Sequence, residues 1–149
     1  MVTEPTDLTL DLIAEGDRLA AEQDYAGAEE AYREIIRLDP AIPYAHTGLA
    51  CALMDAGQYA EAEVGFRAAI RLDAHNPYVH NNLGLLLCRL ERQSEAQAEF
   101  RVAVSLDPTF VAAQINLAEV SQDLAEYEPY QPGPFVAWFA ERWNRRMSE

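Results

Sequence analysis

Apolar residues recur three and four positions apart along much of the chain, which is the spacing of one buried face of an α-helix. One such stripe consists of Leu49, Leu53 and Ala56, and the next of Ala62, Phe66, Ala69 and Ile70. Ala56-Gly57-Gln58 separates the two stripes, and Asn76-Pro77 follows the second. Asparagine can cap a helix, and proline suits its first turn. The pattern therefore predicts pairs of short helices joined by tight turns.

This pattern repeats with a period of 34 residues. The similar segments 36–40, 70–74 and 104–108 are separated by this offset. The same offset connects Ala28, Ala62 and Ala96, and it also connects Tyr32, Phe66 and Phe100. A small residue lets two helices approach closely, while the aromatic ring four residues later fills the space beside it. Because one helical hairpin cannot bury both of its faces, neighbouring hairpins must stack.

The 34-residue period, with small, aromatic and proline positions in fixed phase, resembles the tetratricopeptide repeat, whose pattern is Trp-x2-Leu-Gly-x2-Tyr, Ala-x3-Phe and Pro. In that register the repeats are 9–42, 43–76 and 77–110, with a partial repeat at 111–126 inside an array of 9–126, preceded by a lead-in at 1–8. The third repeat matches best, through Leu83, Gly84, Ala96, Phe100 and Pro108. The family's Trp is replaced by His46, His80 and Gln114.

The resemblance implies an all-α fold. We expect a right-handed α-α superhelix, or solenoid, of about three hairpins plus capping helices. The first helices of the repeats would line a concave groove, which in this family binds peptides.

The fourth repeat is cut short. Three prolines fall within residues 127–134, where its second helix should stand, and proline breaks helix interiors. After this proline-rich break, residues 135–149 predict an amphipathic aromatic helix. Its apolar stripe consists of Phe135, Phe139, Trp143 and Met147, flanked by Trp138, and its other face carries Arg142, Arg145 and Arg146.

Such an aromatic helix must find an apolar surface, since each buried aromatic side chain contributes roughly 1.5 to 3 kcal/mol. Phe135, Trp138, Phe139 and Trp143 are the expected docking residues. The open end of the truncated repeat is the favoured surface, and the groove of the same or a neighbouring copy is the second. In the groove, the arginines would pair with Asp17, Glu119 or Asp123. A membrane interface is disfavoured, because three arginines form a narrow basic face.

Composition and charge narrow the function classes. The 149 residues are half hydrophobic, which suits one folded domain. The 25 acidic residues and eleven arginines give a net charge of −14, which opposes binding to nucleic acid and to anionic membranes. Two cysteines and the lack of a signal-peptide pattern favour a reducing cytoplasm.

Enzymatic and metal-binding interpretations are weaker than structural ones, so we expect no enzyme, cofactor or metal. His46 and His80 occupy equivalent places, about 8 to 10 Å apart, whereas zinc ligands lie about 2.1 Å from the metal. They are expected to pack between helices instead, with one ring nitrogen hydrogen-bonded. No catalytic base is placed by spacing next to Cys51 or Cys88. Acidic pairs such as Glu29-Glu30 are expected on solvated helix faces.

The resemblance also implies which side chains line the groove, at fixed places of each repeat. They are Leu10, Ile13, Asp17, Tyr44, Thr47, Cys51, Met54, Tyr78, Asn81, Asn82, Leu85, Cys88, Arg89, Ile115, Asn116 and Glu119. Asn82 and Asn116 share the sixth place, where an asparagine in this family often holds a peptide backbone. A local interhelix hydrogen bond is the alternative for each amide, and core packing is the alternative for Tyr44 and Tyr78.

One activity of the family is disfavoured by the residues present. Members that bind acidic chaperone tails use lysine, arginine and asparagine as a carboxylate clamp. The matching positions here hold Ile13, Asp17, Gly48, Tyr78 and Asn82, which supply no positive charge. We therefore expect a non-enzymatic adaptor, scaffold or assembly factor that binds a peptide or amphipathic helix of another protein. The alternative is a homo-oligomer whose aromatic tail docks in its own or a neighbouring groove.

Overall fold

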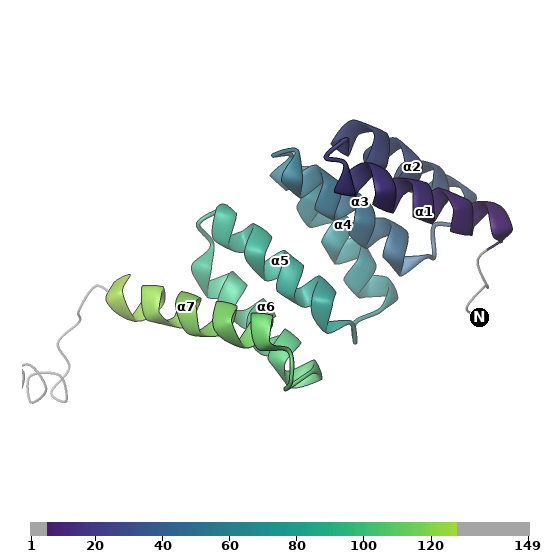
Figure 1. Cartoon of the computed structure of the whole chain (residues 1–149). Coiled ribbons are helices and arrows are strands. Elements are labelled where there is room, and N and C mark those ends of the chain that lie inside the picture. Colours follow the sequence, from purple (N-terminus) through teal and green to yellow (C-terminus); the bar gives the residue numbers. More distant parts are fainter. Residues whose placement is uncertain (1–5, 128–149) are drawn as a thin grey trace, which may run out of the picture.

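The computed structural model describes residues 6–127, and this part of the chain forms seven α-helices and no strand (Figure 1). They are α1 (Asp7–Ala21), α2 (Tyr25–Leu38), α3 (Pro43–Asp55), α4 (Tyr59–Leu72), α5 (Pro77–Arg89), α6 (Gln93–Leu106) and α7 (Val111–Tyr127). None of the helices in this part of the chain is both long and apolar enough to cross a membrane.

The helices form two layers. In Figure 1, α1, α3, α5 and α7 lie side by side in front, and α2, α4 and α6 lie behind them. We call the first set A helices and the second set B helices. Each A helix packs against the B helix that follows it, and each B helix also packs against the next A helix. The expected all-α solenoid of stacked hairpins is confirmed.

Helix ends follow local chemistry. The Asn76 side chain accepts a hydrogen bond from the backbone N–H of Tyr78, and Pro77 opens α5, as the sequence predicts. Asp24 caps α2 in the same way through the N–H of Gly27. Gly57, in the turn between α3 and α4, has φ +79°, a conformation that suits glycine because it has no Cβ.

The loops between hairpins repeat one set of hydrogen bonds. Asp39, Asp73 and Asp107 each accept a bond from the backbone N–H two residues later. In the place of the missing tryptophan, His46, His80 and Gln114 each reach the backbone carbonyl six residues earlier. Because a carbonyl oxygen only accepts, the side-chain nitrogen donates, as an indole N–H would. The contact of His46 fits the expected single hydrogen-bonded ring nitrogen, whereas His80 uses both ring nitrogens, since its Nδ1 also lies 2.7 Å from the Glu99 carboxylate.

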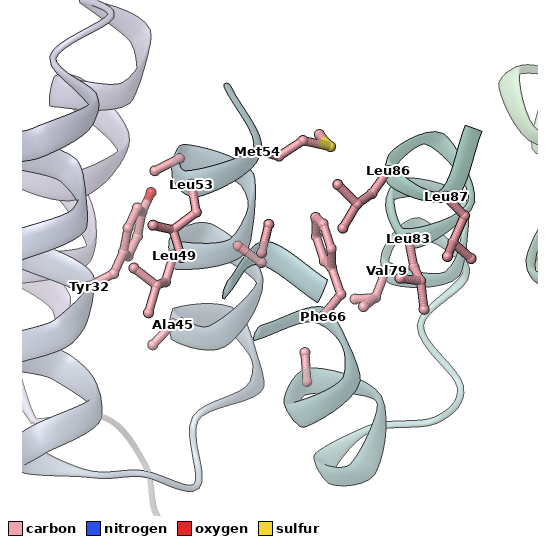
Figure 2. Packing of buried hydrophobic residues seen from close by; sticks show 14 of the residues in the cluster. Tyr32, Ala45, Leu49, Leu53, Met54, Phe66, Val79, Leu83, Leu86 and Leu87 are labelled. Atoms are coloured by element: carbon pink, nitrogen blue, oxygen red, sulfur yellow. The ribbon is translucent and has the colours of Figure 1, made fainter. Parts of the chain in front are cut away.

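The core lies between the two layers. Tyr32, Phe66 and Phe100 are buried on successive B helices, at the predicted 34-residue offset. Figure 2 shows Phe66 between the side chains of α3, which include Leu53, and those of α5, which include Leu83. A Cβ at Gly84 would lie 2.5 Å from the Phe100 ring, so the glycine is needed for this close approach.

Candidate interaction surface

Every A helix exposes at least one large apolar side chain. Leu10, Tyr44, Tyr78 and Ile115 are exposed by 51%, 50%, 59% and 52%. Leu10, Tyr44 and Tyr78 occupy the same place in successive repeats. Both tyrosine rings are thus open to solvent, as the binding hypothesis requires. We call the surface formed by these side chains and their polar neighbours on α1, α3, α5 and α7 the A-helix surface.

Asp17 of α1 joins three helices at one end of this surface. Its carboxylate accepts hydrogen bonds from the hydroxyl of Tyr32, at 2.6 Å, and from the hydroxyl of Tyr44, at 2.9 and 3.0 Å. Burial and the bond to Asp17 raise the pKa of Tyr44 to about 12, and the same two causes raise the pKa of Tyr32 further. Both phenols therefore stay neutral donors, and the Tyr44 hydroxyl is held against Asp17 of α1.

Amide side chains connect the remaining A helices. The Asn116 amide nitrogen of α7 donates to the Asn81 side-chain oxygen of α5 at 2.8 Å. The Asn82 amide nitrogen of α5 lies 3.5 Å from the Cys51 sulfur of α3. A primary amide has two donor hydrogens and one acceptor oxygen, so neither contact uses the full capacity of Asn82 or Asn116. The interhelix alternative and peptide binding are therefore compatible at these two positions.

The predicted lining residues differ in how much surface they offer. Asp17, Arg89 and Glu119 are exposed, like the four apolar residues. The half-buried members are Ile13, Thr47, Cys51, Asn82, Leu85, Cys88 and Asn116. Met54 and Asn81 are buried, because α5 covers Met54 and Asn116 lies over Asn81. Met54 and Asn81 therefore pack beneath the exposed side chains and are not accessible to a ligand. Phe135, Trp138, Phe139 and Trp143 lie outside the described residues.

Carboxylates accumulate toward the C-terminal ends of the A helices. Asp55 and Asp123 occupy the same place of their repeats as Arg89 and are exposed, yet they were not among the predicted lining residues. Their 34-residue offset from Arg89 is the signal that identifies them. Among residues 6–127, neither they nor Asp17 and Glu119 form a salt bridge with an arginine.

These carboxylates act on the two thiols of the surface. Burial, and then the negative charge of Asp55, raise the pKa of Cys51 to about 11. Burial, followed by the charges of Asp123 and Glu119, raises the pKa of Cys88. A nucleophilic cysteine needs a lowered pKa and a positive neighbour. Both thiols therefore stay protonated and serve as small packing groups.

The B helices present a contrasting surface, on which charges are paired. Arg33 of α2 contacts Glu61 of α4 at 2.9 Å, and Arg92, at the start of α6, contacts Glu63 of α4 at 2.7 Å. The hydrogen bond from Arg92 lowers the pKa of Glu63, and a second bond from Arg67 lowers it further. These contacts connect successive hairpins, so we call this face the paired surface.

One open hollow lies between α2 and α4, with a volume of about 480 Å³. Its lining includes the apolar side chains of Leu49, Leu53 and Val64 and the charged side chains of Arg33, Arg37 and Glu61. Gly65 stands there in place of a side chain, since a Cβ would meet the Cβ of Ala50 at 2.9 Å. The equivalent position in the third repeat holds Glu99, whose carboxylate lies 2.7 Å from His80. Both arginines of the lining form salt bridges, Arg33 with Glu29 and Glu61 and Arg37 with Glu34, so neither offers an unpaired charge to a ligand.

Within residues 6–127, no group of three or more histidine, cysteine, aspartate or glutamate side chains lies close enough to hold a metal ion. None of the positions that correspond to a carboxylate clamp holds a cation. Asp17 bonds two tyrosines there, and Asn82 contacts Cys51.

Comparisons with known proteins agree with this geometry. The family model of the tetratricopeptide repeat matches residues 19–86. No curated protein matches the chain. The first tetratricopeptide-repeat domain of Spaghetti (RPAP3), solved with the HSP90 peptide SRMEEVD, is similar at 25% identity and a TM-score of 0.76. That alignment covers 78% of this chain and 93% of that one.

Two further structures share the fold. The Sgt2 tetratricopeptide-repeat domain of Aspergillus fumigatus is 20% identical, with a TM-score of 0.80 over 87% of each chain. The Yersinia enterocolitica secretion chaperone SycD, solved with a peptide of the translocator YopD, is 16% identical with a TM-score of 0.74. That alignment covers 79% of this chain and 95% of that one.

Proposed function

We propose that this chain, whose residues 19–86 match the family model of the tetratricopeptide repeat, is a non-enzymatic interaction module whose A-helix surface binds an apolar segment of another protein. The observation that carries the proposal is the row of exposed side chains Leu10, Tyr44, Tyr78 and Ile115, one from each A helix. Large apolar side chains in contiguous exposed positions are typical of binding sites, and tyrosine is enriched among the residues that dominate binding energy.

The chemistry of the surface favours an extended peptide or an amphipathic helix as the ligand. A row of apolar contacts across parallel helices suits a segment that presents apolar side chains at regular spacing. The amides of Asn82 and Asn116 have remaining donors and acceptors that suit a peptide backbone. Similar domains solved with bound peptides support this assignment by analogy.

Charge selects among such segments. The HSP90 peptide bound to the Spaghetti domain contains two adjacent glutamates. On the surface of this chain such a peptide would meet Asp17, Asp55, Glu119 and Asp123, with Arg89 as the one cation among the predicted lining residues. Like charges placed together cost free energy, so the preferred segment carries arginine or lysine beside its apolar residues. An adaptor or assembly factor for a segment of this kind is the role we assign.

Selection from a library of displayed random peptides tests the proposal on the full-length protein. We expect enriched peptides to combine aromatic or aliphatic residues with arginine or lysine. Their affinity should fall about tenfold or more for Tyr78→Ala, which corresponds to at least about 1.4 kcal/mol. The matched control is Val64→Ala on α4, where the side chain is exposed by 66%. Equal losses for both variants, or enrichment of acidic peptides, would contradict the proposal.

A further inference from the structure

Residues 135–147 contain two tryptophans, two phenylalanines and three arginines, an apolar and basic composition unlike that of the rest of the chain. Residues 1–134 hold eight arginines and 23 acidic residues. A segment with this many aromatic side chains gains free energy from covering an apolar surface. Two faces of the described structure are candidates for that surface: the outer face of α7 and the A-helix surface.

The outer face of α7 does not suit an aromatic segment. In the third repeat, His80 and Gly84 of α5 contact Glu99 and Phe100 of α6, and Leu87 is buried beside them. This is the face on which an A helix receives its B helix. The equivalent residues of α7 are Gln114, Ala118 and Ser121.

These three residues make the outer face of α7 polar. The Gln114 amide donates to the Pro108 carbonyl at 2.5 Å. The Ser121 hydroxyl donates to the Leu117 carbonyl and accepts from Gln97 of α6. Terminal repeats of stacked arrays are commonly polar on their outer side, which keeps them soluble without a covering helix. Ala118 is the single apolar side chain that this set exposes.

The A-helix surface matches the segment in both apolarity and charge. Tyr78 and Ile115 stand exposed on α5 and α7. Glu119 and Asp123, also exposed, lie farther along α7 toward the point where the chain continues into residues 128–134. Seven residues span at most about 25 Å, and neighbouring packed helices lie about 8 to 10 Å apart. The connection is therefore long enough to turn back across α7 and α5.

We propose that residues 135–147 dock on the A-helix surface of their own molecule, with aromatic rings against Tyr78 and Ile115 and Arg142, Arg145 or Arg146 facing Glu119 and Asp123. The inference rests on the proposed function, since it assigns an occupant to the same surface. A partner segment must then displace this one. The surface therefore binds ligands that resemble residues 135–147 in being both apolar and basic.

Tryptophan fluorescence of the full-length protein tests the inference, because the two tryptophans, Trp138 and Trp143, both lie in the docking segment. We expect blue-shifted emission with weak acrylamide quenching. Tyr78→Asp should move the emission toward that of tryptophan in water and increase the quenching. Val64→Asp is the matched control on the paired surface, and Ala118→Arg probes the outer face of α7. Neither should change the emission, and circular dichroism verifies that each variant is folded.

The proposed pairing of the arginines of residues 135–147 with Glu119 has its own control. Glu119→Arg should shift the emission to longer wavelength, whereas Glu30→Arg, at another exposed glutamate, on α2, should not. High salt should move the emission of the wild type toward that of Glu119→Arg, because salt screens the attraction between exposed charges.

Four outcomes would overturn the inference. An emission shift to longer wavelength in Ala118→Arg but not in Tyr78→Asp would place the segment on the outer face of α7. A shift to longer wavelength on dilution of the protein would place it on a second copy. A blue shift that requires anionic phospholipid vesicles would assign it to a membrane, and water-like emission in every variant would leave it undocked. If library peptides still bind the A-helix surface in these cases, the proposed function stands and only the docking of residues 135–147 is wrong. If neither the peptides nor residues 135–147 bind this surface, both proposals are wrong.

Discussion

The A-helix surface and the paired surface carry similar residue types but use them differently. On the paired surface, arginines of α2 and α6 hold glutamates of α4, so charge connects one hairpin to the next. On the A-helix surface, Asp55, Glu119 and Asp123 form no salt bridge with any arginine among residues 6–127. Both surfaces also expose apolar side chains, such as Tyr78 on α5 and Val64 on α4, so the contrast between them lies in the charges. The difference indicates that one face stabilises the stack and the other remains available to a ligand.

The largest expected effect concerns the core that joins the two surfaces. Phe66 is fully buried on α4, with α3 and α5 on either side (Figure 2). Phe66→Ala should lower the free energy of unfolding by about 3 to 5 kcal/mol, because it removes buried apolar area and leaves a cavity. Urea unfolding followed by circular dichroism measures the change. Val64→Ala, two residues away and exposed, should stay within about 0.5 kcal/mol. A midpoint for Phe66→Ala that equals the control would show that the two layers are not coupled there.

The next effect separates binding from folding. Tyr78→Ala should weaken binding of library peptides by at least about 1.4 kcal/mol, a tenfold loss of affinity. Its unfolding free energy should change less, because the Tyr78 ring is 59% exposed and its ring contact is with Phe110, at 4.8 Å between centroids. Isothermal titration calorimetry and urea unfolding on the same variant provide the two numbers. A loss of stability as large as the loss of affinity would make Tyr78 a core residue instead of a binding residue.

A smaller effect concerns the phenol that positions the end of the A-helix surface. Tyr44→Phe removes two hydrogen-bond contacts to Asp17 and should lower the free energy of unfolding by about 0.5 to 1.5 kcal/mol at neutral pH. The pKa of Tyr44 is raised to about 12, so this contribution is present below the phenol's ordinary value near 10 and is lost as pH rises through 12. Tyr78→Phe is the control, since its stability should equal that of wild type. Matching losses in the two variants would argue against a specific role for the bond to Asp17.

The smallest effect tests the paired surface. Glu63→Gln should cost about 0.2 to 1 kcal/mol at pH 7, because its salt bridges with Arg92 and Arg67 are partly exposed. The pKa of Glu63 is lowered below its ordinary 4.5, so the stabilisation is complete above that value and disappears as pH falls through the lower folded-state pKa. Urea unfolding at pH 7 and below pH 4 should show the difference from wild type vanishing. Glu30→Gln should show no difference at either pH, and a loss for Glu63→Gln that persists in acid would contradict the assignment.

The repeat period predicted much of the fold. Phe66, Phe100 and the Asn76 cap are where the sequence places them, because each depends on local spacing within one hairpin. The site was less predictable, since its contacts join side chains from different hairpins. The bond of the Tyr32 hydroxyl to Asp17 distinguishes this tyrosine from the equivalent phenylalanines, and a periodic pattern does not report where a hydroxyl points.

Burial within the site also depends on more than one helix. Met54 and Asn81 occupy places that the register assigns to the groove, yet neighbouring A helices cover them. How closely adjacent A helices approach depends on the packing of every hairpin beneath them, which no single repeat encodes. Asp55 and Asp123 could have been found, because they share the place of Arg89 in the register.

Photo-crosslinking at matched positions tests the central claim most directly. Benzoylphenylalanine in place of Tyr78 or of Val64 puts the same reactive group on the two surfaces, at positions exposed by 59% and 66%. The full-length protein is irradiated alone and with a selected apolar, basic peptide, and adducts are mapped by mass spectrometry. The account predicts adducts at position 78, to residues 135–147 in the first case and to the peptide in the second, and few at position 64. Adducts of equal yield at the two positions, or adducts confined to position 64, would contradict it.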